Sequence, residues 1–300
     1  MLKIKNREFV IAITFCALFT LVLFTPGRKQ ESQKTDTQVV LAEKDWDFGA
    51  GGKDFTADKN QSLNPGEYSF NSFELKNANL MVNTSAGEPS ALTIRAKTII
   101  YIDKDSSIDL SGAGYASRQP GQEQSFSQDR NYEYAGGGGS LGGNGGSGSC
   151  EYSNKALIPS SFSIDREFGT QGGVGSGVDG TPGVGGGYIL LIAPEIVIDG
   201  KVMSNGLAGS GSGGGGSGGK IVILAQKLSI NGSIFANGGN GGTSQIQGAG
   251  GGSGGIVMLS TNQTSKGKIE YLGGRGGQAL DLYTGCSGGN GEPGKLFLVL

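Results

Sequence analysis

The chain has 300 residues, of which 59 are glycine and none is histidine. The glycine content is far above the usual level of about 7%, and because it follows no strict three-residue period, a collagen triple helix is excluded. The formal net charge of −2 provides no basic surface for nucleic acid, and the lack of histidine removes the commonest general base and metal ligand. We therefore predict no nucleic-acid partner, no cofactor, no metal and no catalytic residues.

The first 29 residues predict export. Basic residues at the start precede an uncharged apolar run from Phe9 to Thr25, a pattern typical of an export signal. No small-x-small cleavage site follows this run, which favours a retained signal-anchor that meets the membrane through residues 9–25. A buried core helix is the alternative. With an anchor, the rest of the chain is expected outside the cytoplasm, at the cell surface or in the extracellular space.

Residues 30–62 begin with a polar stretch and are predicted to form a linker and an N-terminal cap. Residues 63–112 contain short runs of β-branched residues separated by turns, so we predict that they form the first coils of a β-helix. Within them, Ala96 is expected to correspond to Ala193 of a later repeat, and Ile99 to Ile196.

Residues 113–187 interrupt the pattern with a segment rich in glycine, serine, aromatic residues and arginine. Aromatic and arginine side chains on such loops are favourable contact groups. The segment is therefore either a partner-binding surface or a cap that packs on itself. The predicted partner-binding residues are Tyr115, Arg118, Phe126, Arg130, Tyr132, Tyr134, Tyr152, Phe162 and Arg166.

Residues 188–300 repeat one pattern three times and begin it a fourth time at Lys295. Recurrence at this period predicts coils that stack directly on one another. The last strand ends without a polar cap, so we predict an open assembly edge formed by Leu296, Phe297, Leu298, Val299 and Leu300. The predicted correspondences are Ile189 with Ile221 and Ile256, Gly200 with Gly232 and Gly267, and Val202 with Ile234 and Ile269.

Each repeat opens with a strand that is apolar on both faces and must therefore be covered on both faces. The material between repeats is glycine-rich, in residues 206–219, 238–255 and 273–294. We predict that these excursions are extended, polyproline-II-like segments stacked on the apolar strands. The alternative is that they are floppy surface linkers, because glycine loses the most entropy on ordering.

Two further residue sets have chemical potential. Asp103, Asp105 and Asp109 form a carboxylate cluster that could cleave a sugar chain or bind a cation, although solvated acids in a turn are the favoured interpretation. Cys150 and Cys286 could form a disulfide between distant loops in an oxidising compartment, or remain unpaired.

The tract Gly250–Gly255, the strand Ile256–Leu259 and the block from Ile221 to Gly239 together resemble exported glycine-rich repeat proteins with a predicted parallel β-helix. That family carries a GGGSGG tract followed by IxLxA, IxIxG and IxAxGG strands. The resemblance implies a structural or adhesive protein of the cell surface and brings no catalytic residues with it.

From the repeats we predict an all-β, right-handed parallel β-helix with long glycine-rich loops, preceded by an N-terminal apolar helix. The predicted function is a structural or adhesive protein that presents its loops on a rigid scaffold. Its partners would be a surface glycan, a protein ligand or further copies of itself. A polysaccharide-binding or polysaccharide-cleaving β-helix enzyme is the alternative.

Overall fold

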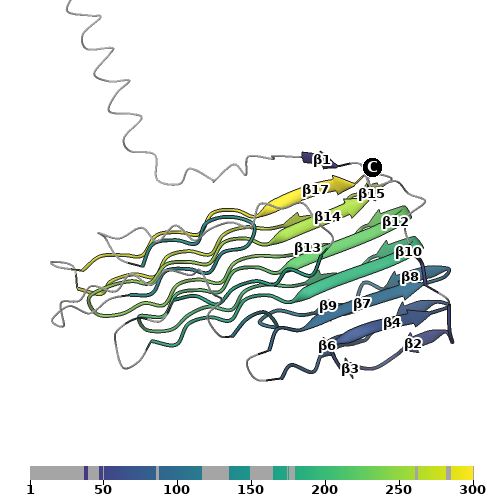
Figure 1. Ribbon diagram of the computed structural model, residues 1–300, viewed down its shortest axis with the longest axis horizontal. Helices are drawn as coiled ribbons and strands as arrows, with labels where there is room; N and C mark the ends of the chain where they lie inside the picture. Colours follow the sequence, from purple (N-terminus) through teal and green to yellow (C-terminus); the bar gives the residue numbers. More distant parts are fainter. Residues whose placement is uncertain are drawn as a thin grey trace, which may run out of the picture. The chain divides into compact units, whose positions relative to one another are not determined.

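The computed structural model (Figure 1) describes residues 37–39, 47–49, 51–85, 88–116, 135–148, 165–173, 175, 180–260, 263–281 and 285–299. All of them belong to the second of two compact units, Lys34–Leu300; the first unit is Met1–Gln33. The predicted signal-anchor, residues 1–29, lies outside the described residues. Among the residues that are described, no helix is long and apolar enough to cross a membrane.

The fold is all-β, as predicted, and every strand pairing is parallel. The strands form one 11-stranded sheet and one 6-stranded sheet. The strands are β1 (Thr37–Val39), β2 (Phe55–Ala57), β3 (Gln61–Leu63), β4 (Gly66–Phe70), β5 (Phe73–Leu75), β6 (Asn79–Val82), β7 (Ala91–Ala96), β8 (Ile99–Ile102), β9 (Ser107–Asp109), β10 (Tyr188–Ile198), β11 (Lys201–Met203), β12 (Lys220–Ile230), β13 (Ser233–Phe235), β14 (Ile256–Ser260), β15 (Gln263–Ser265), β16 (Lys268–Glu270) and β17 (Lys295–Val299).

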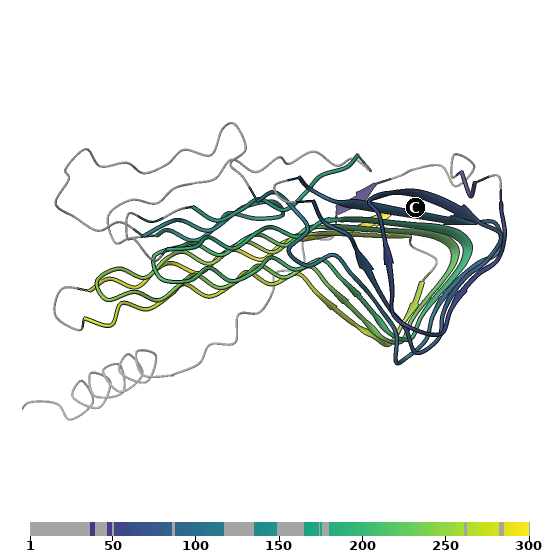
Figure 2. The same cartoon turned by 90° about the horizontal axis from the view of Figure 1, so that it is seen from below.

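Successive repeats lie directly on one another. Strand β10 pairs with β12, which places Ile189 beside Ile221, and β11 pairs with β13, which places Val202 beside Ile234. The predicted stacking of the repeats is thus confirmed, and the arrangement is consistent with a parallel β-solenoid. The solenoid is not closed, because the coils open at one corner into the glycine-rich segments, which run away from the strands in layers (Figure 2).

Two predicted correspondences are wrong by one residue. Ile221 pairs with Val257 rather than with Ile256, and Ile196 pairs with Ile100 rather than with Ile99. Ile221 and Ile256 lie in strands that are apolar on both faces, which have no polar position to fix the register. Ile99 and Ile100 are adjacent isoleucines, so the sequence pattern permits either one to lie beside Ile196.

The first strand of each repeat is buried on both faces, as expected from its composition. Ile189 and Leu191 belong to the cluster inside the coils, whereas Leu190 and Ile192 belong to a second cluster on the outer face. The predicted cover for the outer face was the glycine excursions 206–219, 238–255 and 273–294, but the described hydrophobic side chains that pack on this face come from elsewhere. Leu141 belongs to the glycine-rich part of the insertion, Phe48 and Phe168 are aromatic residues outside the excursions, and Phe297 lies in β17 and extends the sheet face itself.

The coils begin earlier than Leu63. Strand β2 lies within the range 30–62 assigned to linker and cap, and β3 begins in it; they pair with β5 and β6. Phe55, Phe70 and Phe73 pack their rings together at this end, with centroid distances of 4.9 to 5.7 Å. We infer that this aromatic cluster covers the first turn of the core.

The predicted open edge at the C-terminus is wrong for the described residues. Strand β1 pairs with β17, placing Thr37 beside Phe297 and Val39 beside Val299. The chain thereby supplies its own strand to the edge formed by residues 296–299. Leu300 lies outside the described residues.

Candidate functional site

The glycine excursions are ordered arms that hydrogen-bond to one another through their backbones. In the arm 213–219, successive N–H groups donate in three directions, and every third residue donates to the same neighbouring arm. This three-residue period is that of a polyproline II helix, which has no internal hydrogen bonds. The donor–acceptor pairs are Gly213–Ser210, Gly216–Leu207 and Gly219–Ser204, then Gly214–Gly173 and Ser217–Thr170, then Gly215–Gly250 and Gly218–Ser253.

The carbonyl groups of the same arm accept hydrogen bonds from three further arms, so six arms surround it. The donors are Gly183 and Gly186 from one arm, Gly139 from the second, and Gly239 and Gly242 from the third. The polyproline-II-like conformation is thus confirmed and the floppy-linker alternative is wrong. The arms stack on one another, however, and not mainly on the apolar strands.

Close packing explains why this arm contains almost only glycine. A Cβ atom on Gly214 would lie 1.9 Å from the carbonyl oxygen of Gly137, and one on Gly215 would lie 2.0 Å from that of Gly239. Consecutive residues of the arm therefore face different neighbours, and each neighbour is backbone. Because backbone cannot move aside as a flexible side chain can, no position of this kind has room for a larger residue.

The outgoing arms lie at the surface and carry a side chain at every third position. Along 271–279 the burial repeats as buried, exposed and intermediate, with Leu272, Arg275 and Gln278 exposed. The side chains at the equivalent positions of the preceding coil are Asn237, Asn240 and Thr243. No other described arm covers these third positions, which are exposed except for Asn237, and Asn237 is partly exposed.

Side-chain oxygens replace the missing arm on this surface. The Asn237 Oδ1 accepts from the backbone N–H of Leu272 at 2.8 Å, and the Asn240 Oδ1 accepts from that of Arg275 at 2.8 Å. In the same way the Asn205 Oδ1 accepts from the N–H of Asn237. The ladder uses the amide oxygens, and within the described part of the chain the Nδ2 groups of Asn237 and Asn240 donate no hydrogen bond.

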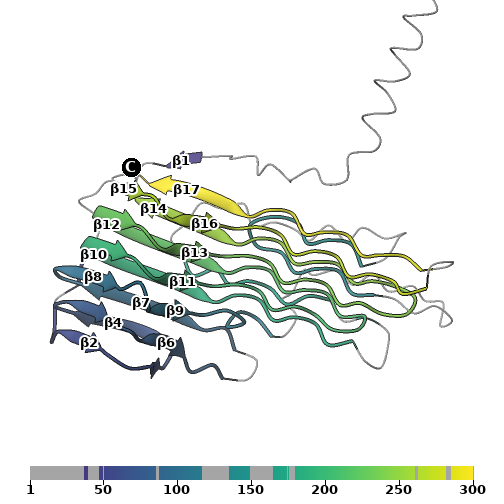
Figure 3. The same cartoon turned by 180° about the vertical axis from the view of Figure 1, so that it is seen from behind.

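The surface continues onto the smaller sheet, whose strands run straight into the outgoing arms (Figure 3). Lys201, Ser233 and Lys268 occupy one row in register. The Lys268 Nζ contacts the Glu270 carboxylate at 2.7 Å and lies 5.7 Å from the centroid of the Phe235 ring. We call this surface the donor face and define it by Lys201, Asn237, Asn240, Lys268 and Arg275.

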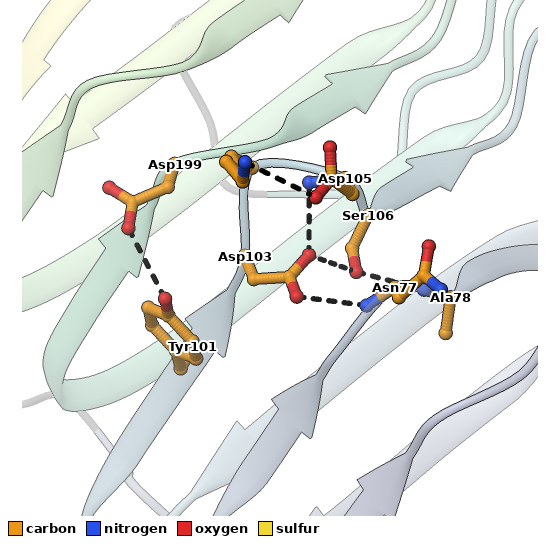
Figure 4. A network of polar contacts seen from close by, with 8 residues as sticks. Asn77, Ala78, Tyr101, Asp103, Asp105, Ser106 and Asp199 are labelled. Carbon is orange, nitrogen blue, oxygen red and sulfur yellow. Dashed lines mark hydrogen bonds and ion pairs between the residues drawn. The ribbon is translucent and has the colours of Figure 1, made fainter.

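The carboxylate cluster of the alternative prediction forms a turn (Figure 4). Asp103 Oδ2 accepts from the N–H of Asn77 at 2.8 Å, and Oδ1 accepts from the N–H of Asp105 and the hydroxyl of Ser106. Burial raises the pKa of Asp103, but the bonds from Ser106, Asn77 and Asp105 outweigh it and hold the pKa below 3.8. A general acid needs a raised pKa, so Asp103 has the opposite property.

The other members of the cluster do not face Asp103 as a catalytic partner. Asp105 is exposed and lies 3.7 Å from the Lys104 Nζ, and Asp109 accepts from the N–H of Ser111. The Tyr101 hydroxyl donates to the carboxylate of Asp199 on the next coil at 3.4 Å. Burial is the larger cause of the raised pKa of Tyr101, and the negative charge of Asp199 is the second. The described part of the chain contains no group of three metal-ligating side chains placed to hold an ion.

Two of the predicted partner-binding residues are described, and both make internal contacts. Tyr115 packs edge-on against Phe168 at 5.6 Å, and Arg166 forms an ion pair with Glu67. Tyr115 therefore lies against the segment that contains Arg166, and whether the two form a partner-binding site stays a prediction. The other predicted residues lie outside the described residues: Arg118, Phe126, Arg130, Tyr132, Tyr134, Tyr152 and Phe162.

A buried ion pair attaches the end of this segment to the coils. The Lys220 Nζ, with a side chain 1% exposed, lies 2.6 Å from the Glu167 carboxylate and donates to the carbonyl of Asp165. Phe168 contacts the ring of Tyr188, and burial raises the pKa of Tyr188. The segment is therefore fixed at this point by charge and by aromatic packing.

Cys286 is disulfide-bonded. Cys150, the partner predicted from the sequence, lies outside the described residues, so the identity of the pair stays a prediction. Comparison with protein-family models, with curated proteins and with solved structures finds no match to the chain.

The sequence reasoning did not identify the donor face. The signal was present as non-glycine residues at three-residue spacing within the glycine tracts, in Asn237-x-x-Asn240-x-x-Thr243 and Leu272-x-x-Arg275-x-x-Gln278. Such spacing marks the exposed side of a polyproline II helix. It is visible only when each tract is read with a period of three.

Proposed function

We propose that the chain is an exported structural or adhesive protein, in which a right-handed parallel β-helix and its glycine bundle present the donor face as a rigid, flat surface. The observation that supports this function is the arm 213–219 with its six hydrogen-bonded neighbours. An arm bonded on every side has little freedom to bend or twist. The face built on such arms is therefore pre-organised for contact, which lowers the entropy lost on binding.

The location follows from the N-terminal segment. A basic start and the apolar run 9–25 support export, with the run retained as a membrane anchor. In this proposal the body of the protein lies outside the cytoplasm, at the cell surface. The disulfide at Cys286 is the kind of bond that persists in such an oxidising compartment.

The polysaccharide-cleaving alternative receives no support from the Asp103 cluster. Both oxygens of that carboxylate accept hydrogen bonds from their own turn or from the preceding coil. A glycosidase instead needs two carboxyl groups that face each other across the sugar bond, one of them with a raised pKa. We therefore assign Asp103 to the stability of the coil and propose that the chain is not an enzyme.

Surface shaving tests this function. Intact cells that make the protein are treated with an external protease, and the chain is followed with antibodies against the described body. We expect loss of the full-length chain from intact cells, and reduced adhesion of those cells to a glycan-coated surface when the gene is deleted. A chain that is protected in intact cells and cleaved only after lysis would refute the proposal.

A further inference from the structure

We propose that the donor face binds an extended acidic polysaccharide, which lies along the strand and arm from Ser233 to Thr243. This inference rests on the proposed function and specifies the ligand class of the same surface. The track has an aromatic ring at one end, in Phe235, and amide groups at Asn237 and Asn240. Cationic side chains flank it from the coils on either side.

The hydrogen-bonding groups that remain free on the track indicate a ligand rich in hydrogen-bond acceptors. The ladder uses Asn237 Oδ1 and Asn240 Oδ1 to accept backbone N–H groups of the next coil. Each side chain then has only its Nδ2 donor left for a ligand. The track therefore offers donors in a row, and hydroxyl, ring and carboxylate oxygens of a sugar acid supply the matching acceptors.

The spacing of these donors suits a stretched polymer. Asn237 and Asn240 are three residues apart in a polyproline-II-like arm, which corresponds to about 9 Å. This is close to the length of two sugar units in an extended chain. Neighbouring coils lie about 4.8 Å away on each side, near enough for their long cationic side chains to reach a polymer on the track.

The flanking charges favour an acidic chain. Lys201 is exposed on the preceding coil, and no carboxylate pairs with it in the described part of the chain. Lys268 and Arg275 lie on the following coil, where Glu270 balances Lys268. Asp109 lies one coil before Lys201, and its carboxylate accepts a hydrogen bond from the N–H of Ser111. The balance beside the track is thus positive, although the chain as a whole carries −2.

Phe235 supplies the apolar part of the contact. It is partly exposed, Met203 occupies the same row on the preceding coil, and the Lys268 Nζ lies 5.7 Å from its ring centroid. Sugar rings present an apolar face of C–H groups, which packs well on an aromatic ring, while their hydroxyl groups remain free for the amide and ammonium donors.

Binding of the full-length chain in detergent micelles to polygalacturonate, measured by affinity electrophoresis, tests the inference. Dextran serves as the neutral polymer and oligo-deoxythymidine as a different polyanion. We expect retardation by polygalacturonate that weakens with salt, and at least about a 10-fold rise in Kd for Lys201→Gln, Lys268→Gln and Arg275→Gln combined. The matched control combines Lys59→Gln, Lys97→Gln and Lys227→Gln, three exposed lysines outside the track and its two flanking coils on the smaller sheet, and makes the same change in net charge.

A second variant separates binding from folding. Asn237→Asp with Asn240→Asp keeps an oxygen to accept the backbone N–H groups of Leu272 and Arg275, but removes both donors and adds negative charge. We expect lost binding with unchanged hydrogen-exchange protection of those two amides. Equal losses in the control triple variant, no binding to polygalacturonate, or equally tight binding to oligo-deoxythymidine would each overturn the inference. A surface-exposed adhesive protein that failed this assay would leave the proposed function standing.

Discussion

Replacing Gly214 by alanine should disrupt the centre of the glycine bundle. The added Cβ would lie 1.9 Å from the carbonyl oxygen of Gly137, so the two arms must separate. Gly137 accepts from Gly173 at 2.7 Å, and Gly214 donates to Gly173 at 3.0 Å. Overpacking costs about 1–3 kcal/mol and each of these two hydrogen bonds about 1 kcal/mol. We therefore expect a loss of about 3–5 kcal/mol in the free energy of local opening.

Gly173→Ala is the matched control, because it adds the same methyl group to the arm next to Gly214. Its nearest contact would be the Gly137 backbone nitrogen at 3.0 Å, which requires only a small shift. The unfolded chain loses entropy in both variants, which favours alanine by about 0.4–1 kcal/mol. The control should therefore change the free energy by less than about 1 kcal/mol in either direction.

Native-state hydrogen exchange of the arms 136–139 and 213–219 measures both variants, since it reports local opening. In Gly214→Ala these amides should exchange at least about 100-fold faster, while those of β10 and β12 keep their protection. Equal protection in the two variants would refute the assignment of Gly214 to a closely packed interior, because the same methyl group would then be accommodated at both positions.

Three other perturbations follow from particular contacts. Glu167→Gln leaves the buried Lys220 ammonium without its carboxylate and should lower the free energy of unfolding by about 3 kcal/mol, measured by chemical denaturation. Because the pKa of Asp103 lies below 3.8 in the folded chain, its contribution is present above that value and lost as pH falls through the folded pKa; thermal stability should therefore drop below about pH 4, and less so in Asp103→Asn. Non-reducing peptide mapping should recover one disulfide-linked peptide pair, which joins Cys150 to Cys286.

Each of the three has an internal comparison. The comparison for Glu167→Gln is Glu195→Gln, whose partner Lys227 is exposed. The loss in free energy of unfolding in Glu195→Gln should stay under about 1 kcal/mol. Equal losses in the two variants would contradict the claim that burial makes the Lys220–Glu167 ion pair important for stability. A pH profile unchanged by Asp103→Asn would remove that carboxylate from the acid response. Recovery of Cys286 as a free thiol, or joined to Cys16, would contradict the third prediction.

The register of two arms carries the disulfide prediction. The N–H of Glu292 donates to the carbonyl of Asn144, and that of Gly289 donates to Ser147. The two arms therefore run in opposite directions, and each contact is three residues from the last. Continued by one more step of three residues, this register predicts Cys150 opposite Cys286. No spacing in the sequence contains this information, because the bonded residues are 142 and 148 positions apart in the chain.

The strands could be predicted because their side chains alternate or form apolar runs. Corner glycines and the inward β-branched residues, such as Val202 beside Ile234, were correctly aligned because each has only one place in each coil. The register of the apolar strands was not fixed by the pattern, as Ile221 beside Val257 demonstrates. The partner of β17 could not be predicted either, because Thr37–Val39 is only three residues long and lies far from the repeats in the sequence.

The sequence predicted the polyproline-II-like conformation of the glycine arms but not which segments they pack against. Glycine permits close approach wherever it occurs, so a tract of glycines does not reveal which surface approaches it. Leu141 of one tract does cover the apolar strands, whereas Gly214 and Gly215 contact only other arms in their closest approaches. The choice between these partners depends on how many arms lie side by side, which is a property of the whole chain.

The positions of the non-glycine residues in an arm indicate how many of its three sides are packed against other arms. The enclosed arm 248–255 contains nothing larger than alanine or serine, because all three directions of a polyproline II helix meet backbone there. The outgoing arm 271–279 has two such directions and one open to water, so Arg275 and Gln278 fit at the third position. The same physical rule thus creates the rigid interior and selects which side chains reach the donor face. A substitution at Arg275 should therefore alter binding without disturbing the bundle, whereas one at Gly274, whose Cβ would lie 1.9 Å from the Gly239 oxygen, should do the reverse.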